Sequence, residues 1–233
     1  MKCLNLKIDL HVHTCYSSDA VTTPKEVIAY SKKRGLDGVA ITDHDTLAGA
    51  LKLQNSGFIV ISGIEITTLS GHLLALNVNT PIPRKLDINE TIQRIHEAGG
   101  IAVAPHPTLV YKSAPSRQTA SYDAIEVMNS AAIPFRLFTY LNQKLATRLS
   151  LPQTAGSDSH YGPEIGAAYT VIEADPDADE IVQAIRKGAT IPVGESMPWR
   201  VRLKGEALSL KRKIQRERAT LRLQVDLSLS RCA

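Results

Sequence analysis

Short apolar segments alternate with amphipathic segments along most of the 233-residue chain. The apolar segments are rich in Ile, Val, Leu and Ala, which is typical of largely buried strands. They lie at residues 6–10, 38–42, 58–67, 71–78, 101–104, 122–127, 153–156 and 169–173. The amphipathic segments repeat their apolar positions at helical spacing and predict helices at residues 24–34, 87–98, 134–149 and 177–187. Ile88, Ile92 and Ile95, for example, fall on one face of the second helix.

Alternating strands and helices predict an α/β fold built from βα units. Seven or eight short strands within about 200 residues fit a closed TIM-like barrel better than an open sheet, because such barrels typically have about 250 residues or slightly fewer. The C-terminal ends of the strands in this fold meet on one face, where active sites form. We therefore expect one barrel over residues 1–198, with its site at that face.

The last 35 residues differ from the rest in charge and pattern. The net charge of the chain is +4, and residues 199–233 contribute ten Lys or Arg against three Asp or Glu. Residues 208–223 predict a basic helix, and residues 221–229 alternate apolar and polar positions as a strand does. This basic C-terminal extension either packs against the barrel as a solvated helix, which we favour, or binds nucleic acid through phosphate contacts.

Composition excludes several classes of protein. No apolar stretch is long enough to cross a membrane, and the first residues are too polar for a secretory signal. The three cysteines are few and widely spaced, so no disulfide framework is expected. These features predict a cytoplasmic protein.

Six of the seven histidines lie at or just after predicted strand ends, close to carboxylates. His11 and His13 are two residues apart on the first strand, so their side chains point the same way and suit one metal ion. A pair of buried, hydrogen-bonded histidines is the alternative for these two. The other candidate ligands are Asp19, His44, Glu65, His72, His106, Asp158 and His160. His96 falls inside a predicted helix, where we expect a surface or packing role.

Glu65 interrupts the Ile-rich strand at residues 58–67. Burying an unpaired carboxylate is costly, and a metal ion removes that cost. An ion pair with Lys or Arg is the weaker alternative. Asp158 and His160 repeat the spacing of two, which alone is a weak signal.

The candidates form a stronger case together than apart. Nine potential ligands exceed the needs of one ion, so two or three ions sharing a carboxylate are expected. Imidazole and carboxylate ligands favour Mn²⁺, Zn²⁺ or Fe²⁺ over Ca²⁺, and Mg²⁺ is a further candidate. Such a cluster binds a phosphate oxygen, lowers the pKa of a bridging water and stabilises a leaving oxygen, which predicts a hydrolase.

Six short segments carry a resemblance to a known family. They are Asp9-Leu10-His11-Val12-His13-Thr14, Thr42-Asp43-His44-Asp45, Gly63-Ile64-Glu65, Gly71-His72, Pro105-His106-Pro107 and Ser157-Asp158-Ser159-His160. Their order and spacing resemble the PHP (polymerase and histidinol phosphatase) family of metal-dependent phosphoesterases over roughly residues 5–195. The resemblance implies a distorted seven-stranded (βα) barrel and a trinuclear site.

The resemblance also implies which residues share an ion. The first ion takes His11, His13, Glu65 and Asp158, the second takes Glu65, His72 and His106, and the third takes Asp19, His44 and His160. Some family members have a histidine where this chain has Asp19, so the identity of the third ion is less fixed.

The expected reaction is hydrolysis of a phosphate ester by a metal-bound hydroxide, without a protein nucleophile. The substrate would be a nucleotide, a nucleoside bisphosphate or another small phosphorylated metabolite. Glu65 and Asp158 would act catalytically through the ions, and His72 or Asp45 would protonate the leaving group. Lys112 and Arg117 would bind the substrate phosphate, although ordinary solvated loop charges explain them equally well.

Three other functions stay open. An exonuclease-like phosphodiesterase would act on nucleic-acid ends. An amidohydrolase-type deaminase or amidase also carries two histidines spaced by two on its first strand, but that class usually ends with a lone Asp. A non-catalytic module would use ions only to support the fold and its basic extension to bind nucleic acid.

Overall fold

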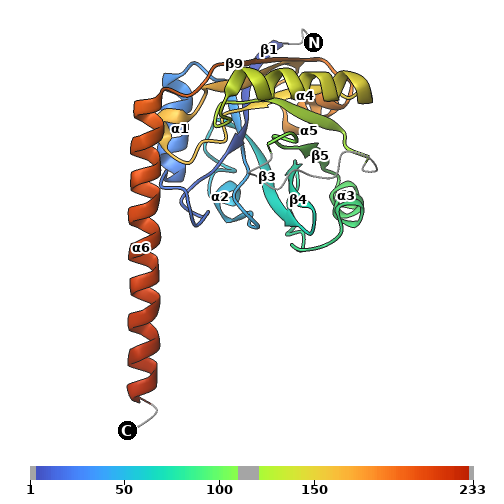
Figure 1. The fold of residues 1–233 in the computed structure, drawn as a ribbon. Helices are drawn as coiled ribbons and strands as arrows, with labels where there is room; N and C mark the ends of the chain where they lie inside the picture. The colour runs from blue at the N-terminus through green and yellow to red at the C-terminus, as the bar shows by residue number, and fades with distance from the viewer. Residues whose placement is uncertain (1–3, 110–120, 231–233) are drawn as a thin grey trace.

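The computed structural model describes residues 4–109 and 121–230, and its strands form one sheet that curls into a nearly closed barrel (Figure 1). The strands are β1 (Leu4–Val12), β2 (Gly38–Ile41), β3 (Ile59–Thr68), β4 (Gly71–Leu76), β5 (Ile101–Ala104), β6 (Ala124–Asn129), β7 (Gln153–Gly156), β8 (Ala168–Ala174) and β9 (Thr190–Gly194). Their order in the sheet is β7-β6-β5-β4-β3-β2-β1-β8-β9. The predicted α/β barrel is confirmed.

The sheet is mixed rather than wholly parallel. β1 pairs in parallel with β2, β2 with β3, β5 with β6 and β6 with β7, whereas β4 and β8 run antiparallel to both of their neighbours. Only Leu69 and Ser70 connect β3 to β4, and a parallel crossover needs a dozen or more residues. The prediction of repeated βα units is therefore wrong at this hairpin.

The barrel closes next to the ends of β1 and β7. The His13 amide donates a hydrogen bond to the Ser159 carbonyl at 3.0 Å, and the Asp158 amide donates to the His11 carbonyl at 2.9 Å. These bonds hold the segment after β7 against β1, although the two strands are far apart in sequence. Residues near His11 and Asp158 consequently share one end of the barrel.

Helices cover the outside of the barrel. They are α1 (Pro24–Lys33), α2 (Ala48–Leu51), α3 (Ile88–Glu97), α4 (Phe135–Leu149), α5 (Ala178–Arg186) and α6 (Trp199–Ser230), with a short 3₁₀ helix at Gly162–Glu164. The Thr23 side chain and Glu26 form a capping box at the start of α1, and Pro24 occupies its first turn. Ile88, Ile92 and Ile95 of α3 are buried as their spacing predicts.

β9 is absent from the prediction, and its pattern explains why. Its residues are only partly buried, apart from Ile191, which is exposed, and Pro192 lies within it. Proline in a sheet is restricted mainly to edge strands, and β9 is an edge strand in this sheet. A pattern search for apolar runs does not detect such a strand.

The C-terminal extension is one long helix, α6. The predicted helix at residues 208–223 is confirmed and is longer than expected, whereas the strand predicted at residues 221–229 is wrong. A strand needs a neighbouring strand for its backbone hydrogen bonds, but a helix satisfies its own, and Leu, Arg and Gln are good helix formers. The far end of α6 projects beyond the barrel (Figure 1). Neither α6 nor any other helix in the described ranges has the length and apolarity needed to cross a membrane.

Candidate metal centre

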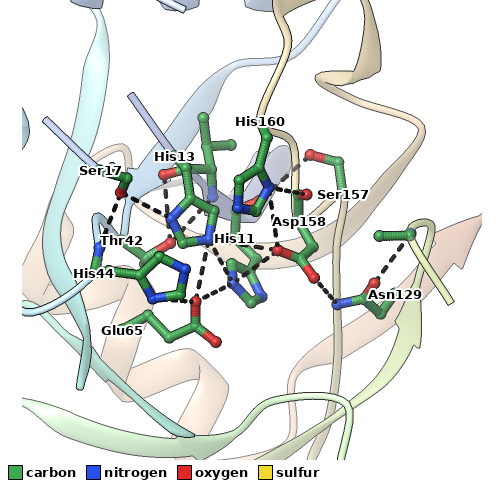
Figure 2. A network of polar contacts seen from close by, with 12 residues as sticks. His11, His13, Ser17, Thr42, His44, Glu65, Asn129, Ser157, Asp158 and His160 are labelled. Carbon is green, nitrogen blue, oxygen red and sulfur yellow. Dashed lines mark hydrogen bonds and ion pairs between the residues drawn. The ribbon is translucent and has the colours of Figure 1, made fainter. Parts of the chain in front are cut away.

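All nine predicted ligands come together at one end of the barrel. They extend from the ends of β1, β2, β5 and β7, from within β3 and β4, and from the loop after β1. Figure 2 shows six of these side chains pointing toward one another. The nine residues are His11, His13, Asp19, His44, Glu65, His72, His106, Asp158 and His160.

Four of them, His11, His13, Glu65 and Asp158, form what we call the buried group. The Nε2 atoms of His11 and His13 lie 3.1 Å apart. Glu65 Oε2 lies 3.4 and 3.2 Å from the Nε2 atoms of His11 and His13, and Asp158 Oδ1 lies 3.5 and 3.4 Å from them. Four ligands about 2.0–2.1 Å from one ion in a tetrahedral arrangement lie about 3.3 Å apart. The buried group therefore has the spacing of a metal site.

Hydrogen bonds fix which nitrogen of each ring faces the others. His11 Nδ1 lies 3.0 Å from Glu126 Oε1, a carboxylate oxygen that accepts the ring proton. His13 Nδ1 lies 3.3 Å from Ser17 Oγ, and the Ser17 hydroxyl donates its own proton to Asp43. The lone pairs of both Nε2 atoms thus point at each other and at two carboxylate oxygens. A cation between them removes the repulsion, so the donor set fits a divalent ion.

The charges in the buried group shift its pKa values strongly. Burial alone would raise the pKa of Glu65, but the charge on His11 and hydrogen bonds from three histidines hold it well below its usual range. Burial opposes a charge on His11, but Asp158, Glu126 and Glu65 raise the pKa of its imidazole. Without a metal, one proton on an imidazole partly replaces the cation that these carboxylates attract.

Asp19, His44 and His160 form what we call the open group. Asp19 Oδ2 lies 3.5 Å from His44 Nε2 and 3.4 Å from His160 Nε2. The Asp19 side chain is 45% exposed, whereas His44 and His160 are 23% and 24% exposed. Despite partial burial, the two histidines lower the pKa of Asp19, and Asp19 and Glu65 help to raise the pKa of His44 to about 9 against the effect of burial.

His72 and His106 complete the arrangement around the second oxygen of Glu65. Glu65 Oε1 lies 2.9 Å from His72 Nδ1 and 3.4 Å from His106 Nε2. Glu65 Oε2 meanwhile faces His11, His13 and His44. Glu65 thus lies between all the ligand sets, as expected of a carboxylate shared by several ions.

Glu126 supports the site but is missing from the prediction. It is buried in β6, and besides His11 it accepts hydrogen bonds from the His106 amide at 3.0 Å and from Asn129 Nδ2 at 2.9 Å. Asn129 Nδ2 also donates to Asp158 Oδ2 at 3.2 Å. A carboxylate inside an apolar strand is the same signal that identifies Glu65, so the sequence contains the information needed to find it.

Two aspartates position the loops that carry the ligands. Both Asp43 oxygens accept hydrogen bonds from Thr14 and Ser17 at 2.7–3.2 Å, which holds the loop after His13. Asp9 accepts hydrogen bonds from the Ser157 and Gly166 amides at 2.9 Å, which holds both ends of the segment that carries Asp158 and His160. These two carboxylates fix backbone rather than face the ligand cluster.

Three predicted residues are not placed at the cluster by the structure. Asp45 uses its carboxylate to accept hydrogen bonds from the amide and hydroxyl of Thr67, with Arg84 3.7 Å away. These contacts hold the segment after β2 against β3. The role of Asp45 as a proton donor stays a prediction. Lys112 and Arg117 lie outside the described residues. His96 contacts Asp123 on the surface of α3, as expected of a residue outside the site.

The metal centre opens into a cavity of about 600 Å³. One wall carries Asp19, His44, His72, His160 and Glu65. Six of the other lining residues come from α6. This volume is typical of pockets that bind small organic ligands.

Comparison with known proteins identifies the family. The PHP domain profile matches residues 9–115, and the PHP-associated profile matches residues 141–190. An uncharacterized protein of Methanocaldococcus jannaschii is 41% identical over 116 residues, which is 44% of this chain and 68% of that protein. A probable phosphatase of Syntrophotalea carbinolica is 25% identical over 73% of this chain and 87% of its own length. A 5'-3' exoribonuclease of Haemophilus influenzae is 28% identical over 42% of this chain and 38% of its own length.

Solved structures share the fold. A two-domain protein of Bacteroides vulgatus, described as containing a predicted PHP-like metal-dependent phosphoesterase, superposes with a TM-score of 0.67 at 18% identity over 83% of this chain and 66% of that one. A lesion-specific endonuclease of Pyrococcus furiosus gives a TM-score of 0.65 at 17% identity over 82% of this chain and 59% of that one. The matched profiles show that the chain belongs to the PHP family of metal-dependent phosphoesterases, and the shared fold and the convergent ligands agree with this.

Proposed function

We propose that this protein hydrolyses the phosphate ester of a small molecule such as a nucleotide or a sugar phosphate. One observation carries the proposal: nine imidazole and carboxylate side chains, seven of them in groups spaced closely enough to hold metal ions, converge beside a cavity of about 600 Å³. A purely structural metal site is normally closed. Here His44, His72, His160 and Asp19 line the cavity, so ions held by them would be accessible to a substrate.

The ligand sets fit two or three divalent ions. The buried group would hold one, the open group a second, and Glu65 with His72 and His106 a third. When bound, such ions lower the pKa of water and offset the charge that develops on phosphate oxygens. Manganese, zinc and iron suit this mixture of nitrogen and oxygen ligands best, and magnesium is a further candidate.

The surrounding residues favour water over a side chain as nucleophile. Ser209 is the hydroxyl residue among the described residues that line the cavity, and its hydroxyl donates to the Asp19 carbonyl. Cysteine is absent from the same set. Direct attack by water, without a covalent enzyme intermediate, therefore fits the site.

His72 is a better candidate than Asp45 for proton transfer to the leaving oxygen. Its side chain lines the cavity and is 27% exposed, whereas the Asp45 carboxylate is hydrogen-bonded to Thr67. His72 Nδ1 faces Glu65. If Nδ1 binds the third ion, His72 would transfer the proton through Nε2. If that ion is absent, either nitrogen of His72 would be available for proton transfer.

A phosphodiesterase acting on nucleic-acid ends is the second candidate. The basic helix α6 extends from the cavity, and nucleic acid is bound mainly through phosphate contacts. One relative is named an exoribonuclease, and one structural neighbour is named an endonuclease. A cavity of about 600 Å³ has the size expected for a small substrate, which favours the first candidate. A basic helix that projects beyond the barrel could contact a longer nucleic acid, which favours the second.

A phosphate-release screen tests both candidates. Nucleotides, nucleoside bisphosphates, sugar phosphates and short oligonucleotides would be compared in the presence of Mn²⁺, with Glu65→Gln as the matched inactive control. Release from small esters supports the first candidate, and shortening of oligonucleotides supports the second. Turnover of amide substrates without p-nitrophenyl phosphate hydrolysis would instead favour the amidohydrolase alternative.

A further inference from the structure

The helix α6 forms one wall of the cavity, although it lies outside both segments matched by the family profiles. Six of its residues line the cavity together with the ligands. They are Arg202, Gly205, Glu206, Ser209, Leu210 and Lys213. This wall is thus a feature of this chain that the family's matched segments do not supply.

The contact between α6 and the barrel is closely fitted. Gly205 is buried, and a Cβ atom added there would lie 2.5 Å from Glu164 Oε1 and 3.1 Å from Tyr161 Cβ. Glycine inside a helix costs about 1 kcal/mol relative to alanine, so its presence at the closest approach has a packing reason. The helix is therefore seated in a defined register against the residues that follow β7.

Side chains of α6 reinforce this register at two places. The Arg202 guanidinium donates to the Ala131 carbonyl at 2.9 Å and to the Ser130 carbonyl at 3.2 Å. Ser209 donates to the Asp19 carbonyl, and Arg212 donates to the carbonyls of Ala20 and Cys15. The second set ties α6 directly to the loop that carries the open-group ligand Asp19.

Lys213 occupies a distinctive position on this wall. It lies one helical turn beyond Ser209, on the same face, and its exposed side chain lines the cavity. The other cationic residue of α6 in the cavity wall, Arg202, already donates to two carbonyls. Lysine binds phosphate as a point charge with three rotatable donors, so it needs no fixed geometry to do so.

We propose that Lys213 is a substrate-positioning residue that binds phosphate oxygens at the mouth of the cavity. The proposal rests on the proposed function of the metal centre. Two further carboxylates, Glu164 and Glu206, line the cavity, and the cationic side chains of its α6 residues are Arg202 and Lys213. An exposed ammonium group in the lining of the cavity would attract an anionic ester and donate hydrogen bonds to its oxygens.

The chain offers a matched control two residues away. Lys211 is exposed on the same helix and does not line this cavity, but lies in a groove formed by other residues of α6. Lys213→Gln and Lys211→Gln therefore remove the same charge from the same helix, and only the first removes it from the cavity. Circular dichroism of both variants would verify that α6 and the barrel are retained.

Steady-state kinetics on the full chain with Mn²⁺ is the first measurement. We expect Lys213→Gln to raise KM for the best ester found in the screen about tenfold with little change in kcat, because a charge-assisted contact made on binding is lost. Lys213→Arg should restore most of the affinity, and Lys211→Gln should leave KM unchanged. Equal KM values for the two glutamine variants would overturn the proposal.

Calorimetry with inorganic phosphate and Mn²⁺-loaded protein gives a readout that needs no turnover. Lys213→Gln should weaken phosphate binding about tenfold relative to both wild type and Lys211→Gln. If the wild type hydrolyses no ester but binds phosphate in this Lys213-dependent way, the proposed function fails and the anion site stands. If esters are hydrolysed but both variants bind phosphate as wild type does, the proposed function stands and Lys213 is a solvated charge.

Discussion

The buried and open ligand groups use the same residue types but differ in how much protein surrounds them. Side chains of the buried group are at most 2% exposed, whereas those of the open group are 23–45% exposed. The rings of His11 and His13 are each held by a second hydrogen bond, to Glu126 and Ser17. Under the proposed function, the buried group would hold its ion away from solvent, and an ion in the open group would be accessible to substrate.

The largest expected effect comes from the carboxylate that joins the two groups. Glu65→Gln keeps the shape of the side chain but removes the charge shared among the ions, so we expect turnover to fall to background with little loss of fold. His11→Ala should have the same result. Phosphate release and thermal unfolding would be measured together, with the surface variant His96→Ala as the control. Near-wild-type rates in both site variants would contradict the assignment.

A smaller loss is expected from Glu126→Gln. Glu126 accepts three hydrogen bonds, and the amide of glutamine would turn a donor toward one of these donors. Substitution of residues that orient metal ligands typically costs about 10–100-fold in metal affinity or activity. Metal titration and kcat would be compared with an exposed control, Glu97→Gln. An unchanged metal affinity would show that the buried group does not depend on this support.

Asp19→Asn should affect only the open group. We expect it to lower the metal content by one ion per chain after dialysis and to reduce activity about tenfold, because the ligand loses its charge while the buried group is intact. Elemental analysis gives the metal content directly. Asp45→Asn is the comparison, because its carboxylate bonds to Thr67 and should not alter the metal content. A loss of more than one ion per chain from Asp19→Asn would show that the two groups do not bind metal independently.

The smallest effect concerns pH in the metal-free protein. The pKa of His44 is raised to about 9 in the fold, and that of His11 is also raised. Protonation of these imidazoles therefore stabilises the fold, and this stabilisation is complete when the pH is below 6.5, the pKa of histidine in the unfolded chain. The contribution of His44 is lost as pH rises through about 9. We therefore expect Tm in EDTA to fall by several degrees from pH 6.5 to pH 9, since 1 kcal/mol corresponds to about 2–4 °C at this size.

Bound metal should reverse the dependence on pH, because protons then compete with the ion for the same nitrogens. The variant His44→Asn should show a shallower fall in Tm over the same range than the wild type. A Tm that rises with pH in EDTA would mean that these imidazoles are neutral in the metal-free fold.

The ligands were predictable because their positions follow from local rules. Alternation along β1 places His11 and His13 on one side, and the ends of several strands meet at one end of the barrel. Glu65 was recognisable as a charge inside an apolar strand. The same rule applies to Glu126, which lies in the predicted strand at residues 122–127 and also interrupts an apolar run.

The position of α6 was not predictable from its own residues. Its seat depends on the carbonyls of Ser130 and Asp19 and on the space left by Gly205, all of which are tertiary features. Apolar and polar residues alternate at positions 221–229, which predicts a strand. The local sequence does not show whether a partner strand is present. The antiparallel direction of β4 follows from its short connection to β3. The length of that connection can be seen in the sequence, but the alternation of strands and helices elsewhere favours parallel strands.

The most direct test of the account is anomalous diffraction from a crystal soaked in manganese. The account predicts anomalous peaks between His11, His13, Glu65 and Asp158 and between Asp19, His44 and His160, with the peak of the open group weakening first on brief chelation. A crystal that takes up manganese elsewhere while both groups show no anomalous density would contradict it.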